Sequence, residues 1–207
     1  LNSITAVQQS QISQLTYSTA LVNLNALSDV TKAAGMTNDL MSKLGAFVGA
    51  EAIGHAIVDF SASHKYGALD SVTDYLTTTQ KNALNGTIYL DIALHNIADG
   101  DNRLVTTDDA QIAAVARDFM VKLGAQTPAS GVGYAMAVFA ENHNWGGLDA
   151  VTDYLTSTQK TQINPITLDY VLHQIADGDN RVVTTDDASI AAVARDFMVK
   201  LGAQTPA

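Results

Sequence analysis

The stretch Ile112-Ala-Ala-Val-Ala-Arg-Asp-Phe-Met-Val-Lys-Leu-Gly-Ala-Gln-Thr-Pro-Ala129 occurs twice in this chain of 207 residues, and its second copy, residues 190–207, is unchanged. Apolar residues recur within it at spacings of three and four: Ile112, Val115, Phe119 and Leu123. That spacing places them on one face of an α-helix. The repeated stretch therefore predicts two equivalent helices.

The duplication extends upstream of this helix. Asp91–Ala129 and Asp169–Ala207 are identical at 34 of 39 positions, and weaker matches at an offset of 79 reach back to His64 and His143. A fainter copy covers the N-terminal part of the chain. A segment that is written more than once usually builds one structural unit more than once. We therefore expect three segments: a degenerate half repeat with capping helices (1–47), helical repeat 1 (48–129) and helical repeat 2 (130–207).

Helical periodicity runs through both full repeats, and no segment alternates as a half-buried strand would. Each repeat is expected to hold four helices, which in the first copy span residues 49–62, 69–76, 79–97 and 108–123. Thr77 and Gln80 have the spacing of a capping box at the start of the third helix, and Asn85-Gly86 is expected to break it. The predicted fold class is all-α, with two four-helix units after an N-terminal half repeat.

The amino-acid composition argues against several classes of function. The net charge of −10 argues against nucleic-acid binding, which needs clustered Lys and Arg. No apolar run approaches the roughly 20 residues of a membrane span. The chain has no Cys, so disulfides and thiol chemistry are excluded. An acidic, Thr- and Ala-rich chain that begins at Leu1 favours a secreted, periplasmic or cell-surface protein.

An Asp-rich loop stands out between the third and fourth expected helices. Of the 21 acidic residues, 19 are Asp, a residue type that favours turns, helix caps and cation loops. Carboxylates that lie two residues apart can converge on one hard cation. The candidate ligands in the first copy are Asp99, Asp101, Asp108 and Asp109, and their twins are Asp177, Asp179, Asp186 and Asp187. Turn formation and helix capping without an ion are the alternative, and Arg103 could neutralise the cluster.

The loop and its surroundings resemble the EF-hand and dockerin group of calcium-binding proteins. The resemblance covers Leu76-Thr-Thr-Thr-Gln80, Asp99-Gly-Asp101 and Val105-Thr-Thr-Asp-Asp109. It implies calcium as the bound ion, with Asp99 and Asp101 as early ligands and Asp108 or Asp109 as the late acidic ligand. The sequence departs from that group at Arg103, in a loop one residue shorter, and in having no Glu at the closing position.

Histidines supply the competing hypotheses. His64 and His143 each precede an aromatic residue and a glycine, a pattern that could form a rim for haem or another small ligand, or a turn pinned by the aromatic ring. Asp91–His95 and Asp169–His173 are spaced i, i+4, as in an acid–base pair or an ordinary helix pair. No catalytic motif accompanies them, so an enzyme is less favoured.

These observations lead to one expectation with alternatives. We expect a secreted or surface-associated helical repeat protein that binds calcium or another cation through its Asp loops. It would act as a structural or interaction module towards a protein or an extracellular-matrix partner. The alternatives are a haem or small-ligand binder, or an enzyme with an Asp–His site in each repeat.

Overall fold

The computed structural model describes residues 5–101, 108–178 and 187–205. Within these ranges every regular element is a helix, so the all-α prediction is confirmed. Ten of the helices form five antiparallel pairs: α2 (Gln14–Asn25) with α3 (Val30–Leu44), α4 (Ala50–Ala62) with α5 (Tyr66–Asp74), α7 (Ile88–Asp99) with α8 (Asp109–Leu123), α9 (Ala129–Glu141) with α10 (Trp145–Thr152), and α12 (Pro165–Asp177) with α13 (Asp187–Leu201).

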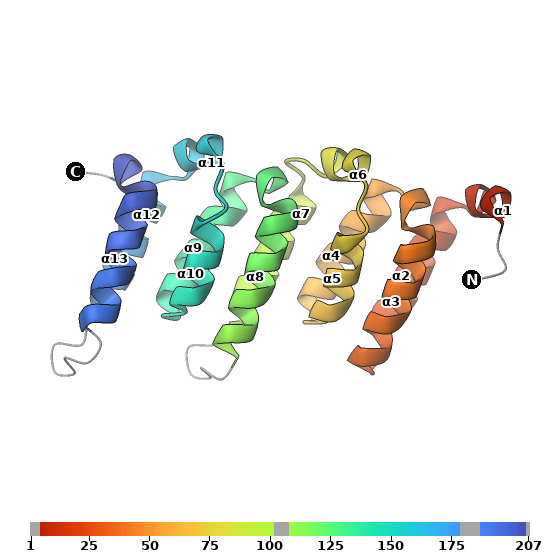
Figure 1. Cartoon of the computed structure of the whole chain (residues 1–207), viewed down its shortest axis with the longest axis horizontal. Coiled ribbons are helices and arrows are strands. Elements are labelled where there is room, and N and C mark those ends of the chain that lie inside the picture. The colour runs from red at the N-terminus through yellow and green to blue at the C-terminus, as the bar shows by residue number, and fades with distance from the viewer. Residues whose placement is uncertain (1–4, 102–107, 179–186, 206–207) are drawn as a thin grey trace.

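Short helices connect the pairs. They are α6 (Thr78–Ala83) and α11 (Ser157–Gln162), with the 3-10 helices η1 (Gly45–Phe47) and η2 (Gly124–Gln126). Two more short helices flank the stack: α1 (Ala6–Gln11) before the first pair and η3 (Gly202–Gln204) after the last. In Figure 1, α6 and α11 lie along one edge of the molecule, and α8 begins at the opposite edge. Helices α4–α8 and α9–α13 follow the same order along the chain.

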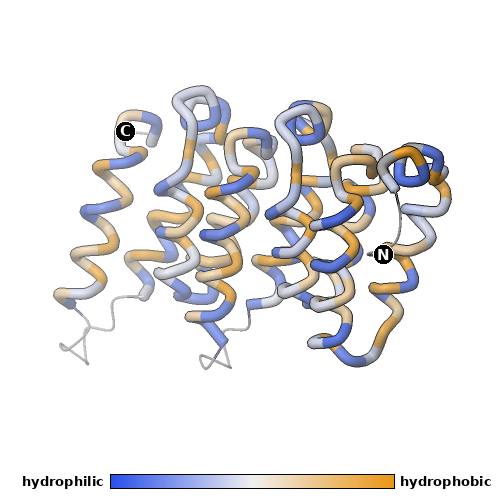
Figure 2. Tube along the Cα trace, turned by 45° about the vertical axis from the view of Figure 1, so that its right-hand side comes forward, coloured by the Kyte–Doolittle hydropathy of each residue, from blue (hydrophilic) through white to orange (hydrophobic). Residues whose placement is uncertain are grey.

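The helix pairs stack side by side in two layers (Figure 1). In one layer α2, α4, α7, α9 and α12 each contact the next member, and in the other α3, α5, α8, α10 and α13 do the same. The two chain ends therefore lie at opposite ends of the stack. Hydrophobic and hydrophilic segments alternate along the helices (Figure 2), as expected for helices that bury one face.

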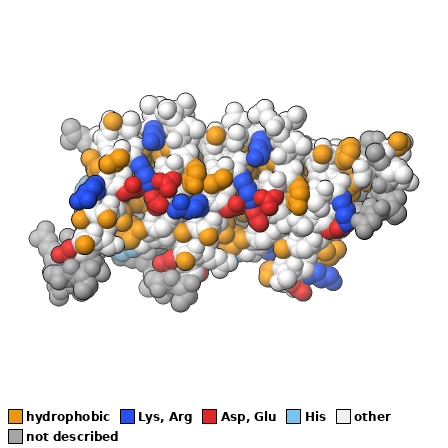
Figure 3. Space-filling model, in the orientation of Figure 1, with side chains coloured by type: hydrophobic (Ala, Val, Ile, Leu, Met, Phe, Trp, Pro, Cys, Tyr) orange, Lys and Arg blue, Asp and Glu red, His pale blue; other side chains and the backbone are white. Residues whose placement is uncertain are grey.

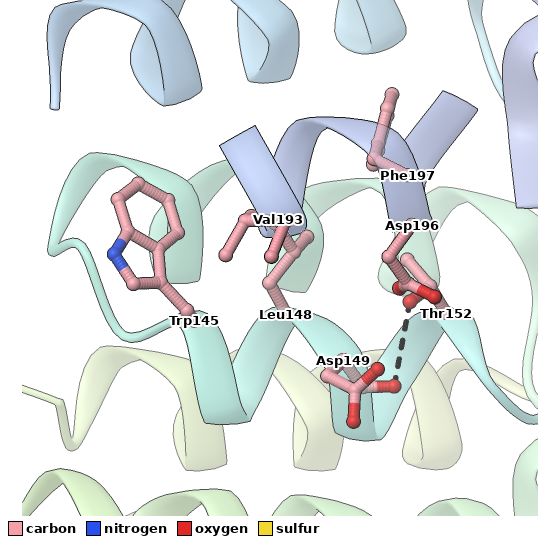
Figure 4. A pocket seen from close by; sticks show the side chains of 8 residues that line it. Trp145, Leu148, Asp149, Thr152, Val193, Asp196 and Phe197 are labelled. Carbon is pink, nitrogen blue, oxygen red and sulfur yellow. Dashed lines mark hydrogen bonds between the residues drawn. The ribbon is translucent and has the colours of Figure 1, made fainter. Parts of the chain in front are cut away.

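A continuous hydrophobic core runs along the stack. Four of the five helix pairs contribute a fully buried phenylalanine to it: Phe60, Phe119, Phe139 and Phe197. At the last junction, Leu148 of α10 lies beside Val193 of α13 (Figure 4), and both residues line, together with Phe197, a small pocket of about 210 Å³. Within the described ranges, no helix combines the length and the apolar composition that a membrane crossing requires.

The helix expected at 79–97 is two helices. The α6 helix gives way at Leu84 to a turn in which Gly86 adopts φ +68°, and α7 starts at Ile88. A left-handed residue cannot continue an α-helix, which is why the chain breaks there. In the second copy Pro165 supplies the start of α12 instead. The unit therefore has five helices, not four.

The capping box predicted at Thr77 and Gln80 also joins two helix pairs. The buried Gln80 amide accepts a hydrogen bond from the Thr77 backbone at 2.8 Å and donates to the carbonyls of Gly45 and Val48 at 2.8 and 2.6 Å. Its twin Gln159 repeats the arrangement. One side chain thus caps its own helix and holds the 3-10 helix of the preceding pair.

Charged residues gather at two equivalent places on the face shown in Figure 3. Lys122 lies 2.5, 2.6 and 2.7 Å from carboxylates of α5 and α8: Asp70, Asp74 and Asp118. Lys200 repeats this with Asp149, Asp153 and Asp196 at 2.6, 2.5 and 2.6 Å. At the first pair, Lys43 contacts Asp39 of its own helix. Each ammonium of the later pairs therefore links two neighbouring helix pairs.

Candidate metal centre

Three carboxylates converge where α7 leads into α8. Asp101 follows α7, Asp108 immediately precedes α8, and Asp109 is the first residue of α8. Each offers one oxygen atom, and these atoms all lie within 4.8 Å of one another. Oxygen atoms bound to one calcium ion at about 2.4 Å lie no more than about 4.8 Å apart. The spacing is therefore compatible with a shared cation.

Burial makes this cluster electrostatically costly. Asp101 is 6% exposed, and its Oδ2 and the Oδ1 of Asp108 have no hydrogen-bond partner among the described residues. Burial, followed by repulsion from Asp109 and Asp108, raises the pKa of Asp101. Burial and the charge of Asp108 likewise raise the pKa of Asp109. A positive charge in this position would relieve both effects.

The Asp108 carboxylate does not cap α8 and is therefore available to bind a cation. Asp at an N-cap commonly accepts a hydrogen bond from a backbone N–H of the first turn. Here Asp108 occupies the N-cap of α8, with φ −102° and ψ −10°, yet its side chain makes no such bond. Within the described chain no Lys or Arg forms an ion pair with the three carboxylates. Arg103, the residue considered for neutralisation, lies outside the described residues.

Two neighbouring helix pairs flank the cluster. From α5, the Tyr66 hydroxyl approaches Gly100, where a Cβ atom would lie only 2.4 Å from it. Burial and the charges of Asp108 and Asp101 raise the pKa of Tyr66 to about 12. From the α9–α10 turn, Asn144 Nδ2 donates to Asp101 Oδ1 at 3.2 Å and to the Asp109 carbonyl at 3.1 Å. The cluster thus lies between parts of both repeats.

Not all predicted ligands join this cluster. Asp99 is exposed at the end of α7 and accepts a hydrogen bond from the Tyr134 hydroxyl at 2.8 Å, towards α9. In the second copy, Asp177 ends α12 and Asp187 starts α13, and both are exposed. Asp179 and Asp186 lie outside the described residues. The geometry of a site can therefore be given only for the first copy.

The two histidines proposed for ligand binding end helices. His64 and His143 have φ of 54° and 58°, the left-handed conformation of a helix C-terminus that usually holds glycine. Their rings stack on Tyr66 and Trp145, with centroids 5.8 and 5.2 Å apart. The α7–α8 pair separates the two turns. Their common geometry is that of a turn pinned by an aromatic ring.

The two Asp–His pairs differ in their surroundings. His95 Nε2 lies 3.9 Å from Asp91 Oδ1, and the His95 ring stacks on Tyr134 of α9 with centroids 3.9 Å apart. In the second copy the His173 and Asp169 side chains are 70% and 56% exposed. Among the described residues, the Ser130 hydroxyl donates to Asp91 Oδ1 at 2.9 Å, whereas His95 Nε2 has no hydrogen-bond partner, so no serine hydroxyl bonds to this imidazole. These geometries fit helix-surface pairs.

Asn142 and Asn144 are not among the candidate residues that the sequence indicated. Asn142 Nδ2 donates to the Asp101 carbonyl at 3.2 Å, and Asn144 reaches the same residue across 43 positions of sequence. A signal existed in the duplication. Around the shared His-x-aromatic-Gly pattern, Ser63 and Lys65 of the first copy are replaced by these two asparagines in the second.

Three comparisons with known proteins found no match. No protein-family model matches it, and neither a curated protein nor a solved structure does so.

Proposed function

We propose that this chain is a helical repeat protein that binds calcium, or another hard divalent cation, through Asp101, Asp108 and Asp109. The observation that carries the proposal is the convergence of three carboxylates, two of whose buried oxygen atoms have no hydrogen-bond partner among the residues that the structure describes. Hard cations prefer several oxygen ligands in a compact loop. The Asp101 carbonyl already accepts from Asn142, so the carboxylates are the primary ligands.

The role that we propose is structural. A cation at this place would offset the repulsion within the cluster and fix α7 against α8, which stabilises the folded state. Without a bidentate Glu, a dissociation constant on the order of 0.1–1 mM is expected for calcium, in the range of extracellular modules. This affinity is in keeping with a secreted or surface-associated protein that contacts protein or matrix partners.

Isothermal titration calorimetry on the chelator-treated full chain tests the proposal. Calcium should bind, and the triple variant Asp101→Asn, Asp108→Asn, Asp109→Asn should lose one site. The matched control changes the twins Asp179, Asp186 and Asp187 to Asn and should retain the first site. An Asp99→Asn variant should also bind, because Asp99 faces Tyr134. Unchanged calcium binding by the first triple variant would overturn the assignment.

The pKa shifts give the proposal a pH dependence. Because the folded-state pKa values of Asp101 and Asp109 are raised, these groups favour the fold below the ordinary Asp pKa, and that contribution is lost as pH rises through the raised values. Bound calcium acts in the opposite direction, since it needs the ionised carboxylates. The melting-temperature gain from calcium should therefore grow from pH 4 to pH 6. A constant gain would contradict the assignment to these groups.

A further inference from the structure

Two turns in the molecule reach back to the preceding helix pair in the same way. In the α9–α10 turn, Asn142 and Asn144 donate hydrogen bonds to Asp101, and Asn144 also reaches the Asp109 carbonyl. The α4–α5 turn lies 79 residues earlier and approaches the α2–α3 connection. We name these contacts the second joint (α7–α8 with α9–α10) and the first joint (α2–α3 with α4–α5).

The first joint contains a permanent cation. The Lys65 ammonium donates to the carbonyl of Asn25, and Ser63 Oγ donates to Asn25 Oδ1 at 2.6 Å. Lys65 is the twin of Asn144, and Ser63 is the twin of Asn142. The connection that Lys65 approaches is short and has no carboxylate cluster. A positive side chain therefore lies where the second joint has a neutral amide.

The second joint has the opposite charge balance. Its turn contributes the side-chain amides of Asn142 and Asn144, and the connection that they meet carries Asp101, Asp108 and Asp109. Asp101 is more than nine-tenths buried, its Oδ2 has no hydrogen-bond partner in the described chain, and one of its carboxylate oxygens lies within 4.8 Å of those offered by Asp108 and Asp109. The second joint thus differs from the first in two ways: Asn144 occupies the position of Lys65, and the connection that it contacts carries three carboxylates. Among the residues that the structure describes, no Lys or Arg side chain pairs with these three carboxylates.

We propose that a divalent cation at Asp101, Asp108 and Asp109 controls the second joint and supplies there the positive charge that Lys65 supplies permanently at the first. This inference rests on the proposed cation site. The coupling runs through Asn144, whose Oδ1 accepts from the Gly147 backbone at 2.9 Å at the start of α10. An ion that fixes Asp101 fixes Asn144, and Asn144 fixes the first turn of α10. Cation binding therefore tightens the contact between two helix pairs.

Trp145 provides an intrinsic fluorescent reporter at the second joint. Trp145 is the only tryptophan of the chain, follows Asn144 directly and stacks on His143. Its ring also approaches Gly178, where a Cβ atom would be 2.9 Å away, so a change at Gly178 could alter its fluorescence as well. Trp145 fluorescence is therefore measured in the variant in which Asp179, Asp186 and Asp187 are changed to Asn.

The experiment titrates calcium chloride into this full-length variant. Trp145 fluorescence should change and saturate with the same dissociation constant that calorimetry measures. Amide hydrogen exchange in α9 and α10 should slow with calcium, by about tenfold or more at the first turn of α10. Magnesium chloride serves as a second probe and should act more weakly because its coordination is less adaptable.

Exchanging the joint residues provides the sharper test. Asn144→Lys should raise the melting temperature in EDTA, weaken calcium binding about tenfold or more and abolish the calcium-dependent fluorescence change. The reverse exchange, Lys65→Asn, should lower the melting temperature without creating a calcium response at the first joint. If Asn144→Lys fails to fold, Asn144→Ala should bind calcium while its α10 amides stay unprotected.

The possible outcomes separate the two proposals. Absence of calcium binding in calorimetry overturns the proposed function, and the joint inference with it. Calcium binding that leaves both Trp145 fluorescence and α10 hydrogen exchange unchanged overturns the joint inference alone. Calcium binding by Asn144→Lys with an undiminished fluorescence change does the same.

Discussion

Helices α8 and α13 share an identical sequence from Ile112 and Ile190 onwards, yet their environments differ. Met120 in α8 is 2% exposed because α9 and α10 follow it, whereas its twin Met198 in α13 is 47% exposed. Both helices bury their other face, as Phe119 and Phe197 are 1% and 2% exposed. The comparison teaches that periodicity identifies an apolar face, and that the next helix pair decides whether the face is buried.

Replacing the twin methionines by alanine tests this difference most strongly. Met120→Ala should lower the free energy of unfolding by about 2–4 kcal/mol, because it removes buried atoms and leaves a cavity. Met198→Ala should change it by less than about 0.5 kcal/mol, as at an exposed site. Chemical denaturation of both variants measures the two effects. Equal losses would mean that the α13 face is covered in solution.

The capping glutamines provide the second comparison. Gln80 caps α6 and also donates to the Gly45 and Val48 carbonyls, whereas the described hydrogen bonds of the exposed Gln8 stay within the capping box of α1. Gln80→Ala should therefore cost about 2 kcal/mol, since the Val48 carbonyl loses this donor and the Gly45 carbonyl keeps only the Val48 N–H. Gln8→Ala should cost no more than about 1 kcal/mol. Urea denaturation would show comparable losses if the inter-pair bonds contribute nothing.

The lysines that link neighbouring pairs should show a smaller difference. Lys122→Ala leaves Asp70, Asp74 and Asp118 facing one another and should cost about 1 kcal/mol, reduced from the buried-pair value because the carboxylates are exposed. Lys43→Ala, which loses only Asp39, should be close to neutral. Thermal melts at low and high salt measure both. A Lys122 effect that is independent of salt would argue against an electrostatic origin.

The smallest expected effect concerns His173. A hydrogen bond to the Asp169 carbonyl, together with the Asp169 carboxylate, raises the pKa of this exposed histidine above its ordinary value. Its contribution to stability is complete below pH 6.5 and is lost as pH rises through the folded-state pKa. An NMR titration of the imidazole should place the midpoint above 6.5, and Asp169→Asn should lower it. An unaltered midpoint in that variant would leave the carboxylate without a role.

Local sequence determined much of the fold. Apolar spacing predicted the helices, and Thr77 with Gln80 marked the start of α6, because capping depends on residues only three apart. The break expected at Asn85-Gly86 separates α6 from α7, because Gly86 readily adopts the left-handed conformation that ends a helix. How the pairs stack depends on contacts between distant residues, which no local pattern contains.

The candidate site could likewise be predicted from local sequence only in part. Asp101, Asp108 and Asp109 were named from the loop alone, and the structure brings them together. Asp99 was grouped with them by spacing, but the end of α7 directs it to Tyr134. Asn144 was missed because its partner lies 43 residues away. Only the difference between the two copies of the turn could have indicated it.

The stacking of helix pairs also sets the order in which the protein comes apart. In the described part of the chain, each interior pair has a neighbouring pair on both sides, whereas α2–α3 and α12–α13 each have one. Opening either of these outer pairs breaks one interface and leaves the remaining pairs intact, as in other one-dimensional arrays. Unfolding of the stack should therefore begin at an outer pair and proceed inwards. Folding, which relies on contacts between successive pairs, can proceed quickly in the reverse direction.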